Sequence, residues 1–314
     1  MPTVSVVIPV YRAALTLREL YGQLSITMPQ ITPTFEIIFV EDCGGDESWS
    51  IITELAAADP RVRGFRMSRN YGQHNALLCG IRAARYDLIV TMDDDLQHPV
   101  SEISPLLAAL ESDVDVVYGA PQNEHHGLLR DFASRLTKIA LASAMGAESA
   151  RNVSAFRAFR TRLRDGFSDY RSPTVSIDVL LTWATSSFAT IKVRHAPRSV
   201  GASGYSASRL IRYAIDLMTG FSTLPLQISS IIGFGLVFFG VAILAVVVGN
   251  YLINGSEVPG FAFLASIIAI FSGAQLFALG IMGEYLARMH FRTMDRPTYL
   301  VSENVASDGV EGRC

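Results

Sequence analysis

The stretch Val90-Thr91-Met92-Asp93-Asp94-Asp95-Leu96-Gln97-His98-Pro99 decides how the rest of the sequence is interpreted. An apolar run typical of a buried β-strand ends here in three successive carboxylates. Open α/β sheets bind ligands at the carboxyl edge of their strands, which is where these acids would lie. Crowded carboxylates repel one another unless a cation neutralises them, and oxygen ligands suit Mg²⁺ or Mn²⁺ bridging to a diphosphate. The alternative is a solvated acidic turn in front of a helix.

The spacing of the acids suggests which of them act together. Alternate residues of an extended segment point to the same side. If the segment after Thr91 stays extended, Asp93, Asp95 and Gln97 share one face and Asp94 points elsewhere.

Strand-like runs alternate with helical patterns on both sides of this stretch. In the first part of the chain, runs rich in β-branched and aromatic residues are followed by polar residues and then by apolar residues at helical spacing. The expected strands are Val4–Val10, Phe35–Val40, an edge-like Arg63–Met67, Leu88–Thr91, Val114–Gly119 and Thr190–Arg194. This alternation predicts an α/β domain with a parallel sheet.

Three polar residues near expected strand ends have more than one interpretation. Asp42 follows a strand, where it either bonds a base or ribose or caps the next helix. Arg69 also follows a strand and is a candidate partner for a phosphate. His74 stands in the first turn of a helix, where we favour a structural hydrogen bond over a catalytic role.

Two long stretches in the second half of the chain contain no charged residue. They span 217–256 and 258–283, and each is longer than the roughly 20 residues that cross a bilayer core. We predict transmembrane helices at about Leu226–Ile253 and Gly260–Ala287, joined by a short turn. Two buried helices of a soluble core are the less favoured alternative.

The residues that flank these helices predict their orientation. Arginines lie before the first helix and after the second, whereas the only charged residue in the turn between them is Glu257. Because basic residues mark the cytoplasmic side, we expect a multi-pass protein of the inner membrane with its catalytic domain and both termini in the cytoplasm. The N-terminus has no basic segment leading into a long apolar run, so we expect no signal peptide.

The composition narrows the possible classes of protein and of binding partner. The 314 residues are 50% hydrophobic and 18% charged, which suits one sizeable domain together with membrane segments. The formal net charge of −3 gives no reason to expect nucleic acid as a partner. The three cysteines, Cys43, Cys79 and Cys314, are scattered, which fits a reducing cytosol rather than a disulfide framework or a zinc site.

Two amphipathic segments lie between the expected sheet and the membrane helices. Around residues 128–139 and 209–218, apolar residues alternate with charged ones at helical spacing. We favour helices lying in the headgroup plane over helices packed on the domain. The expected organisation is a catalytic domain over 1–205, an interfacial amphipathic helix over 206–225, two transmembrane helices over 226–287 and a cytoplasmic tail over 288–314, disordered from Ser302 onward.

Four motifs, in this order and spacing, resemble one family of enzymes. They are Val6–Tyr11, Val40–Asp42, Ser68–His74 and Asp93–Pro99, and the likeness covers about residues 4 to 301. The sequence resembles the inverting glycosyltransferases of family 2, and more narrowly the polyprenyl-phosphate glycosyltransferases such as the dolichyl-phosphate mannose synthases. The resemblance implies a GT-A fold, a Rossmann-like, mixed and mostly parallel sheet. Asp-x-Asp followed by Leu-Gln-His-Pro is a far more specific signal than Asp-x-Asp alone.

The resemblance also implies roles on the donor side. The residues expected at the nucleotide are Pro9, Tyr11, Val40, Asp42 and Asp93, and Arg69 joins them as a phosphate partner. The residues expected to hold Mg²⁺ or Mn²⁺ and the diphosphate are Asp93, Asp95 and Gln97, of which the two acids are also catalytic.

On the acceptor side the resemblance points to residues further along the chain. Arg157 matches an arginine close to the sugar and the acceptor and is the third catalytic candidate. Arg198 and Ser206 match a segment that holds the acceptor phosphate, and Arg209 is a further candidate for that clamp or a surface arginine.

The sequence departs from the family pattern at three places. Arg12 and Ala13 stand where relatives usually have Asn and Glu, which puts part of the nucleotide pocket in doubt. Gly204 replaces a lysine and removes one expected phosphate contact. Residues 152–155 lack the carboxylate that many relatives carry there as a base. A phosphate monoester has a second pKa near 6, however, so the acceptor is largely a dianion at pH 7 and needs no deprotonation.

The expected function follows from these features. We expect inverting transfer of one sugar from a nucleotide-diphosphate sugar, a UDP-sugar in the first instance, to undecaprenyl phosphate or a similar lipid at the cytoplasmic face, for modification of cell-envelope glycans. A processive polysaccharide synthase is disfavoured because neither Trp49 nor Trp183 follows an arginine, as the Gln-x-x-Arg-Trp motif of those enzymes requires. A non-catalytic membrane scaffold, and a homo-oligomer formed through the transmembrane helices, are left open.

Overall fold

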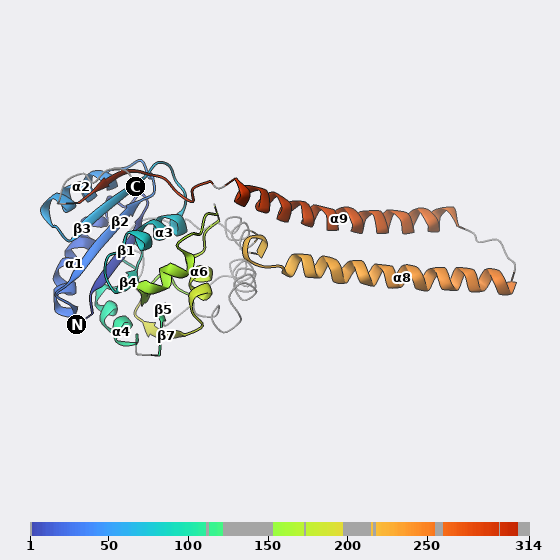
Figure 1. The fold of residues 1–314 in the computed structure, drawn as a ribbon, viewed down its shortest axis with the longest axis horizontal. Helices are drawn as coiled ribbons and strands as arrows, with labels where there is room; N and C mark the ends of the chain where they lie inside the picture. Colours follow the sequence, from blue (N-terminus) through green and yellow to red (C-terminus); the bar gives the residue numbers. More distant parts are fainter. Residues whose placement is uncertain are drawn as a thin grey trace.

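The computed structural model describes residues 2–110, 113–121, 153–172, 174–196, 215, 218–254, 260–294 and 296–306. These residues form an α/β domain from which two long helices extend side by side (Figure 1). The N-terminus and the last described residues both lie in the domain, because the second long helix leads the chain back to it (Figure 1).

One eight-stranded mixed sheet forms the centre of the domain. Its strands are β1 (Val4–Val10), β2 (Phe35–Glu41), β3 (Val62–Met67), β4 (Leu88–Thr91), β5 (Val116–Pro121), β6 (Arg157–Arg160), β7 (Phe188–Val193) and β8 (Val301–Val305). Their order across the sheet is β7-β5-β6-β4-β1-β2-β3-β8. The strands β4, β1, β2 and β3 are parallel neighbours, so their carboxyl ends share one edge. The strands β6 and β8 each run antiparallel to the strands beside them.

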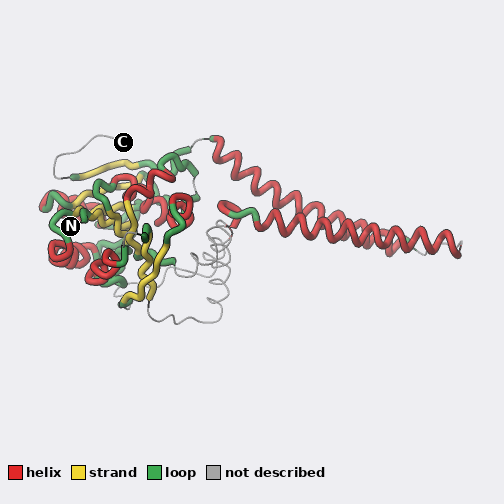
Figure 2. Tube along the Cα trace, turned by 60° about the horizontal axis from the view of Figure 1, so that its bottom comes forward, coloured by secondary structure: helices red, strands yellow, loops and turns green. Residues whose placement is uncertain are grey.

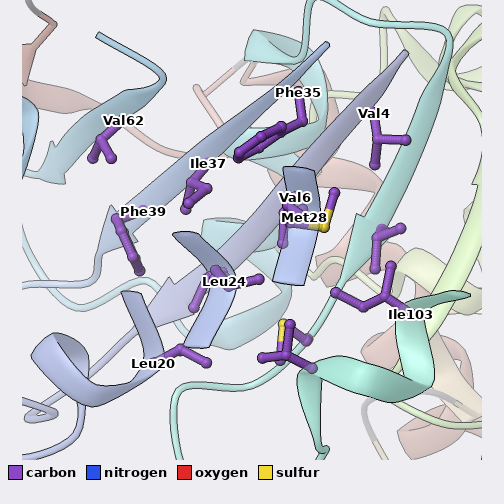
Figure 3. Packing of buried hydrophobic residues seen from close by; sticks show 14 of the residues in the cluster. Val4, Val6, Leu20, Leu24, Met28, Phe35, Ile37, Phe39, Val62 and Ile103 are labelled. Carbon is purple, nitrogen blue, oxygen red and sulfur yellow. The ribbon is translucent and has the colours of Figure 1, made fainter. Parts of the chain in front are cut away.

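Helices cover both faces of this sheet. They are α1 (Leu17–Ile31), α2 (Ser48–Ala58), α3 (Gln73–Ala83), α4 (Ile103–Ala108) and α6 (Ile177–Ala184), with 3₁₀ turns at Val100–Glu102 and Thr161–Phe167. On one face, Leu20, Leu24 and Met28 of α1 pack on the apolar side chains of β1 and β2 (Figure 3). On the other face, α3 and α6 enclose a second core. The strands are buried on both sides, which explains their nearly continuous apolar sequences.

The two predicted membrane helices are confirmed as long, apolar helices outside the domain core. They are α8 (Leu224–Asn254) and α9 (Phe261–Thr293), which contact each other and lie further apart at the end next to the domain (Figures 1 and 2). The apolar windows Leu224–Ile253 and Ile270–Phe291 are long enough to cross a bilayer, and neither is buried in the protein. Side chains such as Phe238, which is 75% exposed, would be unfavourable in water. The alternative of buried helices in a soluble core is therefore wrong.

Two expectations about the edge of the sheet are also wrong. The tail was expected to be disordered from Ser302 onward, but Val301–Val305 forms β8, which pairs with β3. Consequently β3 is an inner strand and not an edge strand. The cause is tertiary: Arg66 of β3 forms an ion pair with Glu303 at 2.8 Å, and the Trp49 indole N–H donates to the same carboxylate.

The remaining differences concern boundaries and omissions. Strand β6 was not predicted, while β5 and β7 begin within two residues of the predicted positions. The first amphipathic segment, most of the second and the proposed boundary at residue 205 lie outside the described residues, so the division into domains stays a prediction there.

Candidate active site

Unusual backbone conformations gather at the carboxyl edge of the parallel strands. Among the described residues, the non-glycine residues with positive φ are Arg12 (56°), Cys43 (52°) and Leu96 (62°). They follow β1, β2 and β4, and Gly72 (95°) follows β3. Left-handed conformations are costly for residues with a Cβ and persist at positions that function requires. Four loops with such conformations at one edge mark it as the candidate active site.

Hydrogen bonds join the loop after β1 to its two neighbours. The backbone N–H of Tyr11 donates to Asp94 Oδ2 at 3.0 Å, so the middle acid faces the β1 loop. Arg12 Nε donates to the carbonyl of Gly44 at 3.0 Å. A Cβ on Gly44 would lie only 2.8 Å from the backbone nitrogen of Arg12. Arg12 thus closes the β1 loop onto the β2 loop, and this close approach requires glycine at position 44.

Asp42 organises the loop after β3. Its two carboxylate oxygens accept hydrogen bonds from the backbone N–H groups of Tyr71 (2.7 Å) and Gly72 (2.8 Å). It does not cap the following helix, because α2 begins at Ser48. Burial raises the pKa of the Asp42 carboxyl to about 6, although the two amide donors act in the opposite direction. The contact of Asp42 with a base or ribose stays a prediction. Both oxygens of its carboxylate already accept hydrogen bonds from this loop.

The loop that Asp42 holds in turn reaches the acids. Gln73, the first residue of α3, donates from its side-chain amide to Asp93 Oδ1 at 2.7 Å. No local pattern in the sequence predicts this contact, because 20 residues separate the partners. The first acid is therefore oriented by a residue from the neighbouring loop.

The acid loop itself bends. Strand β4 ends at Thr91, residues 94–96 form a bend, and Leu96 is left-handed, so the segment is not extended as the alternation argument assumes. The Gln97 N–H donates to Asp95 Oδ1 at 3.1 Å, which turns the chain back on itself. Asp93, Asp95 and Gln97 are all half-buried at the edge.

The donor chemistry of this loop fits a hard divalent cation. Among the residues that the structure describes, no three Asp, Glu, His or Cys side chains converge on one point. The protein therefore offers two carboxylates and an amide oxygen rather than a complete cage. Mg²⁺ sites are commonly of this kind, with one or two carboxylates supplemented by substrate phosphates and water. Asp93, Asp95 and Gln97 are thus suitable ligands for a metal that arrives with a diphosphate.

A buried ion pair lies directly beside the acids. Arg157 opens β6 opposite Thr91, the last residue of β4, and only 2% of it is exposed. Its guanidinium forms a close ion pair with Asp178 of α6 and donates from Nε to Thr91 Oγ1 at 3.1 Å. The Tyr118 hydroxyl donates to Asp178 Oδ1 at 3.0 Å. Contact of Arg157 with sugar or acceptor stays a prediction, since these contacts are all with protein groups.

Two histidines near this pair, the buried His98 and the partly buried His74, have structural contacts. His74 Nδ1 accepts a hydrogen bond from the Ile177 N–H at 3.3 Å, which confirms its expected structural role. Burial lowers the pKa of His74 to about 4. His98 stacks on Phe156 with 5.1 Å between ring centroids, and burial lowers its pKa to about 4 as well. Both imidazoles are therefore neutral at pH 7.

The acid loop also contacts the segment that leads toward the predicted acceptor residues. The Ala196 N–H donates to the Gln97 carbonyl at 2.8 Å, and His195 meets His98 edge to face. Arg194 Nε donates to Glu102 at 2.6 Å. The acceptor candidates Arg198, Ser206 and Arg209 lie outside the described residues, as does Asn152.

The other predicted nucleotide residues take different positions at the edge. Pro9 and Val40 are paired neighbours on β1 and β2 and are buried. Tyr11 is 47% exposed above them, and the exposed Arg69 lies over the Tyr71 ring at 4.6 Å. Tyr11 and Arg69 are thus accessible to a ligand, whereas the Val40 side chain belongs to the core.

The chain is similar to known glycosyltransferases over most of its length. The model for glycosyl transferase family 2 matches residues 5–166, which contain all the loops described above. An undecaprenyl-phosphate 4-deoxy-4-formamido-L-arabinose transferase from Shewanella sediminis is 34% identical over 98% of this chain and 94% of its own length. A protein of the same name from Pseudomonas syringae is 33% identical over 97% and 91%. A solved mannosyltransferase from Pyrobaculum calidifontis, in complex with GDP-Man and Mn²⁺, is 17% identical over 91% and 87%, with a TM-score of 0.47.

The fold and the site thus define an α/β enzyme domain with its ligand edge at the ends of β1 to β4, attached to two candidate membrane helices. The chain belongs to glycosyltransferase family 2. This confirms the expected GT-A class and the expected transferase activity.

Proposed function

We propose that this enzyme transfers one sugar from a nucleotide-diphosphate sugar to a polyprenyl phosphate at the membrane surface. The observation that carries the proposal is the set of interlocked, strained loops around Asp93–Gln97, on a domain that also carries two apolar helices. The names of the similar proteins support the acceptor class, since both are undecaprenyl-phosphate 4-deoxy-4-formamido-L-arabinose transferases. A UDP-sugar is the donor to test first.

On the donor side, each loop has a part in holding the nucleotide. Tyr11, Pro9 and the loop that Asp42 orders would surround the nucleoside, and Arg69 would reach a phosphate. Asp93, Asp95 and Gln97 would hold Mg²⁺ or Mn²⁺, which supplies a positive charge to stabilise the departing diphosphate. Gln73 and the Gln97 N–H keep the two acids in place before the substrate arrives, so little reorganisation is needed on binding.

On the acceptor side, a phosphate must approach the anomeric carbon opposite the leaving group. The acceptor is already a dianion at pH 7, so the missing carboxylate near residue 152 does not prevent reaction. Orientation and charge neutralisation then limit the rate. Arg198, Ser206 and Arg209 are proposed to bind this phosphate. Arg157, which is paired with Asp178, bonds Thr91 and so holds the end of the strand that leads to the acids.

Mass spectrometry of lipids tests the proposal directly. Membranes containing the protein are incubated with polyprenyl phosphate and a panel of UDP-, GDP- and CMP-sugars, and the lipid extract is searched for polyprenyl-phosphate monosaccharide. One product with one added sugar is expected, and it should be absent with Asp95→Ala. Lipid-linked chains of several sugars would favour a processive synthase, and no product with any donor would favour a scaffold.

We also propose that α8 and α9 form a membrane hairpin whose two ends face the cytoplasm. The domain sits at the same end of both helices (Figure 1), and arginines flank that end. In intact cells, and on a background lacking native cysteines, an impermeant thiol reagent should label Ser256→Cys but not Ser302→Cys. Labelling of Ser302→Cys would contradict this orientation.

A further inference from the structure

A cavity of about 530 Å³ lies where the long helices meet the domain. Its wall is formed by the end of α6, the segment before α8 and the last turns of α9. The aromatic and charged residues among its described lining residues are Trp183, Phe221, Glu284, Tyr285, Arg288 and Phe291. None of its described lining residues belongs to the loops around the acids. It is therefore a separate site, and its volume is in the range of small-molecule pockets.

Among the described lining residues, one acid and one base face this cavity as a pair. Glu284 and Arg288 are one turn apart on α9, and an Arg288 nitrogen lies 3.0 Å from Glu284 Oε1. The Arg288 side chain is 21% exposed and that of Glu284 is 51% exposed. The wall thus presents a negative and a positive group within one helical turn, at the end of an apolar helix.

Aromatic rings also line the cavity. Trp183 is 52% exposed, and it packs edge to face on Tyr170 and Phe221 with centroids 5.5 and 6.4 Å apart. The Tyr285 hydroxyl donates to the Ser222 carbonyl at 2.5 Å, which joins α9 to the segment before α8. A rigid indole face beside a carboxylate favours a cationic group.

We propose that this junction cavity binds the headgroup of a zwitterionic phospholipid that carries a primary amine, a phosphatidylethanolamine. The ammonium would lie between Glu284 and the Trp183 ring, and the phosphodiester would bond Arg288, whose planar fork suits two phosphate oxygens. The acyl chains would follow the apolar surfaces of α8 and α9. This proposal requires that the helices span a bilayer, but it does not depend on the sugar or on the acceptor.

The described lining residues of the cavity argue against the acceptor phosphate as its occupant. A monophosphate dianion placed here would meet the Glu284 carboxylate as well as Arg288, and the repulsion would cancel much of the attraction. The acids that would hold the donor lie at the opposite end of α6. That helix has eight residues and is about 12 Å long, and its first turn carries Asp178, the partner of Arg157.

The same geometry links the lipid to the reaction. A lipid held against Trp183 fixes the last turn of α6, and α6 holds Arg157 through Asp178 at its first turn. Bound phosphatidylethanolamine should therefore raise the rate of transfer without changing the KM for the donor.

Binding can be measured without any substrate. The chain has two tryptophans, so in a Trp49→Phe background the fluorescence of Trp183 reports on the cavity alone. The delipidated full-length protein is titrated in detergent with short-chain phosphatidylethanolamine, its mono-, di- and trimethylated forms, and phosphatidylglycerol. We expect a saturable change with the primary amine, at least tenfold weaker binding of the trimethylated form, and no saturable change with phosphatidylglycerol.

Variants and competition complete the test. Glu284→Gln and Arg288→Gln should each weaken binding of phosphatidylethanolamine at least tenfold, whereas Arg18→Gln, which breaks the exposed Arg18–Glu54 pair on the domain, should leave it unchanged. Equal binding of phosphatidylglycerol, no effect of Glu284→Gln, or displacement by polyprenyl phosphate would overturn the proposal. If a variant fails to fold, the methylation series on the parent protein still decides, because it changes only the lipid.

Discussion

The carboxyl edge of the sheet and the junction cavity both gather charged side chains, but their charges are balanced differently. At the edge, three consecutive acids accept hydrogen bonds from amide groups of Tyr11, Gln73 and Gln97. In the cavity, one acid is paired with one base on the same helix.

This difference indicates what each site can bind. Three consecutive carboxylates at the end of a strand repel one another and favour a divalent cation that arrives with a phosphate-bearing ligand. An acid already paired with a base has no net charge to neutralise, so it suits a ligand that carries both signs. Loss of one acid should therefore be severe at the edge and mild in the cavity.

The largest expected effect comes from removing an acid at the edge. Asp95→Ala should lower kcat/KM for sugar transfer by at least about 10³-fold, because about 4 kcal/mol or more of leaving-group stabilisation is lost. The protein should remain folded and in the membrane. The measurement is transfer of radiolabelled sugar to lipid at saturating Mn²⁺.

Two controls accompany that variant. Glu54→Ala removes an exposed acid from α2, outside the site, and should keep full activity. Chelation of divalent ions should reproduce the loss in the parent protein, and full activity in the presence of a chelator would refute the metal-dependent interpretation of the edge.

The next largest effect concerns the buried pair beneath the edge. Asp178→Leu leaves the Arg157 guanidinium buried without its acid and should reduce the free energy of unfolding by about 3–5 kcal/mol. The double variant Arg157→Met/Asp178→Leu should recover most of that stability but not the activity. Thermal unfolding of the purified proteins measures both, and a single variant that melts like the parent would show that the pair does not stabilise the fold.

A somewhat smaller effect is expected on the acceptor side. Arg198→Ala should lower kcat/KM for the acceptor, which corresponds to a loss of about 2–4 kcal/mol of transition-state stabilisation if the guanidinium holds the lipid phosphate in a desolvated site. Arg198→Lys should recover part of this, because a point charge replaces the planar fork. Kinetics with each substrate varied in turn, together with donor binding by calorimetry, provide the measurement. A collapse of donor affinity with unchanged acceptor dependence would assign this arginine to the other substrate.

The smallest effect is expected from Asp42, and it depends on pH. Below about pH 6 its carboxyl becomes protonated, one oxygen becomes a donor, and only one of the Tyr71 and Gly72 amides keeps its acceptor. Activity should therefore fall as the pH drops through 6. Asp42→Asn loses the same acceptor at every pH, which costs about 1–2 kcal/mol, and should remove this pH dependence.

Stability should change in the opposite direction. A pKa raised from 3.8 to about 6 means that the folded state binds the proton more tightly than the unfolded state does. This contribution to stability is complete below pH 3.8 and is lost as the pH rises through 6. The difference in melting temperature between the parent and Asp42→Asn, measured from pH 4 to pH 7, should follow this trend. A constant difference would show that Asp42 does not titrate in this range.

The sequence predicted most of the central sheet and both long helices, because those signals are local. The runs that became β1, β2 and β4 are apolar and β-branched, and any burial of such a run favours a strand. The strands β6 and β8 were missed for the opposite reason. Their sequences contain Arg157, Arg160 and Glu303, and they become strands because a neighbouring strand and an ion pair are available.

What the sequence by itself determined was the position of the acids at the end of a strand, the family, and the presence of two apolar helices. The acids and the apolar helices depend on residues that are close together in the chain, and the family depends on motifs that are each short. Only the tertiary structure decided that Asp42 holds the β3 loop, that Gln73 orients Asp93, and that Arg157 is paired with Asp178. These partners lie 20 to 30 residues apart. The pattern of one segment cannot show which distant side chain will meet it, because the packing of strands and helices brings the two together.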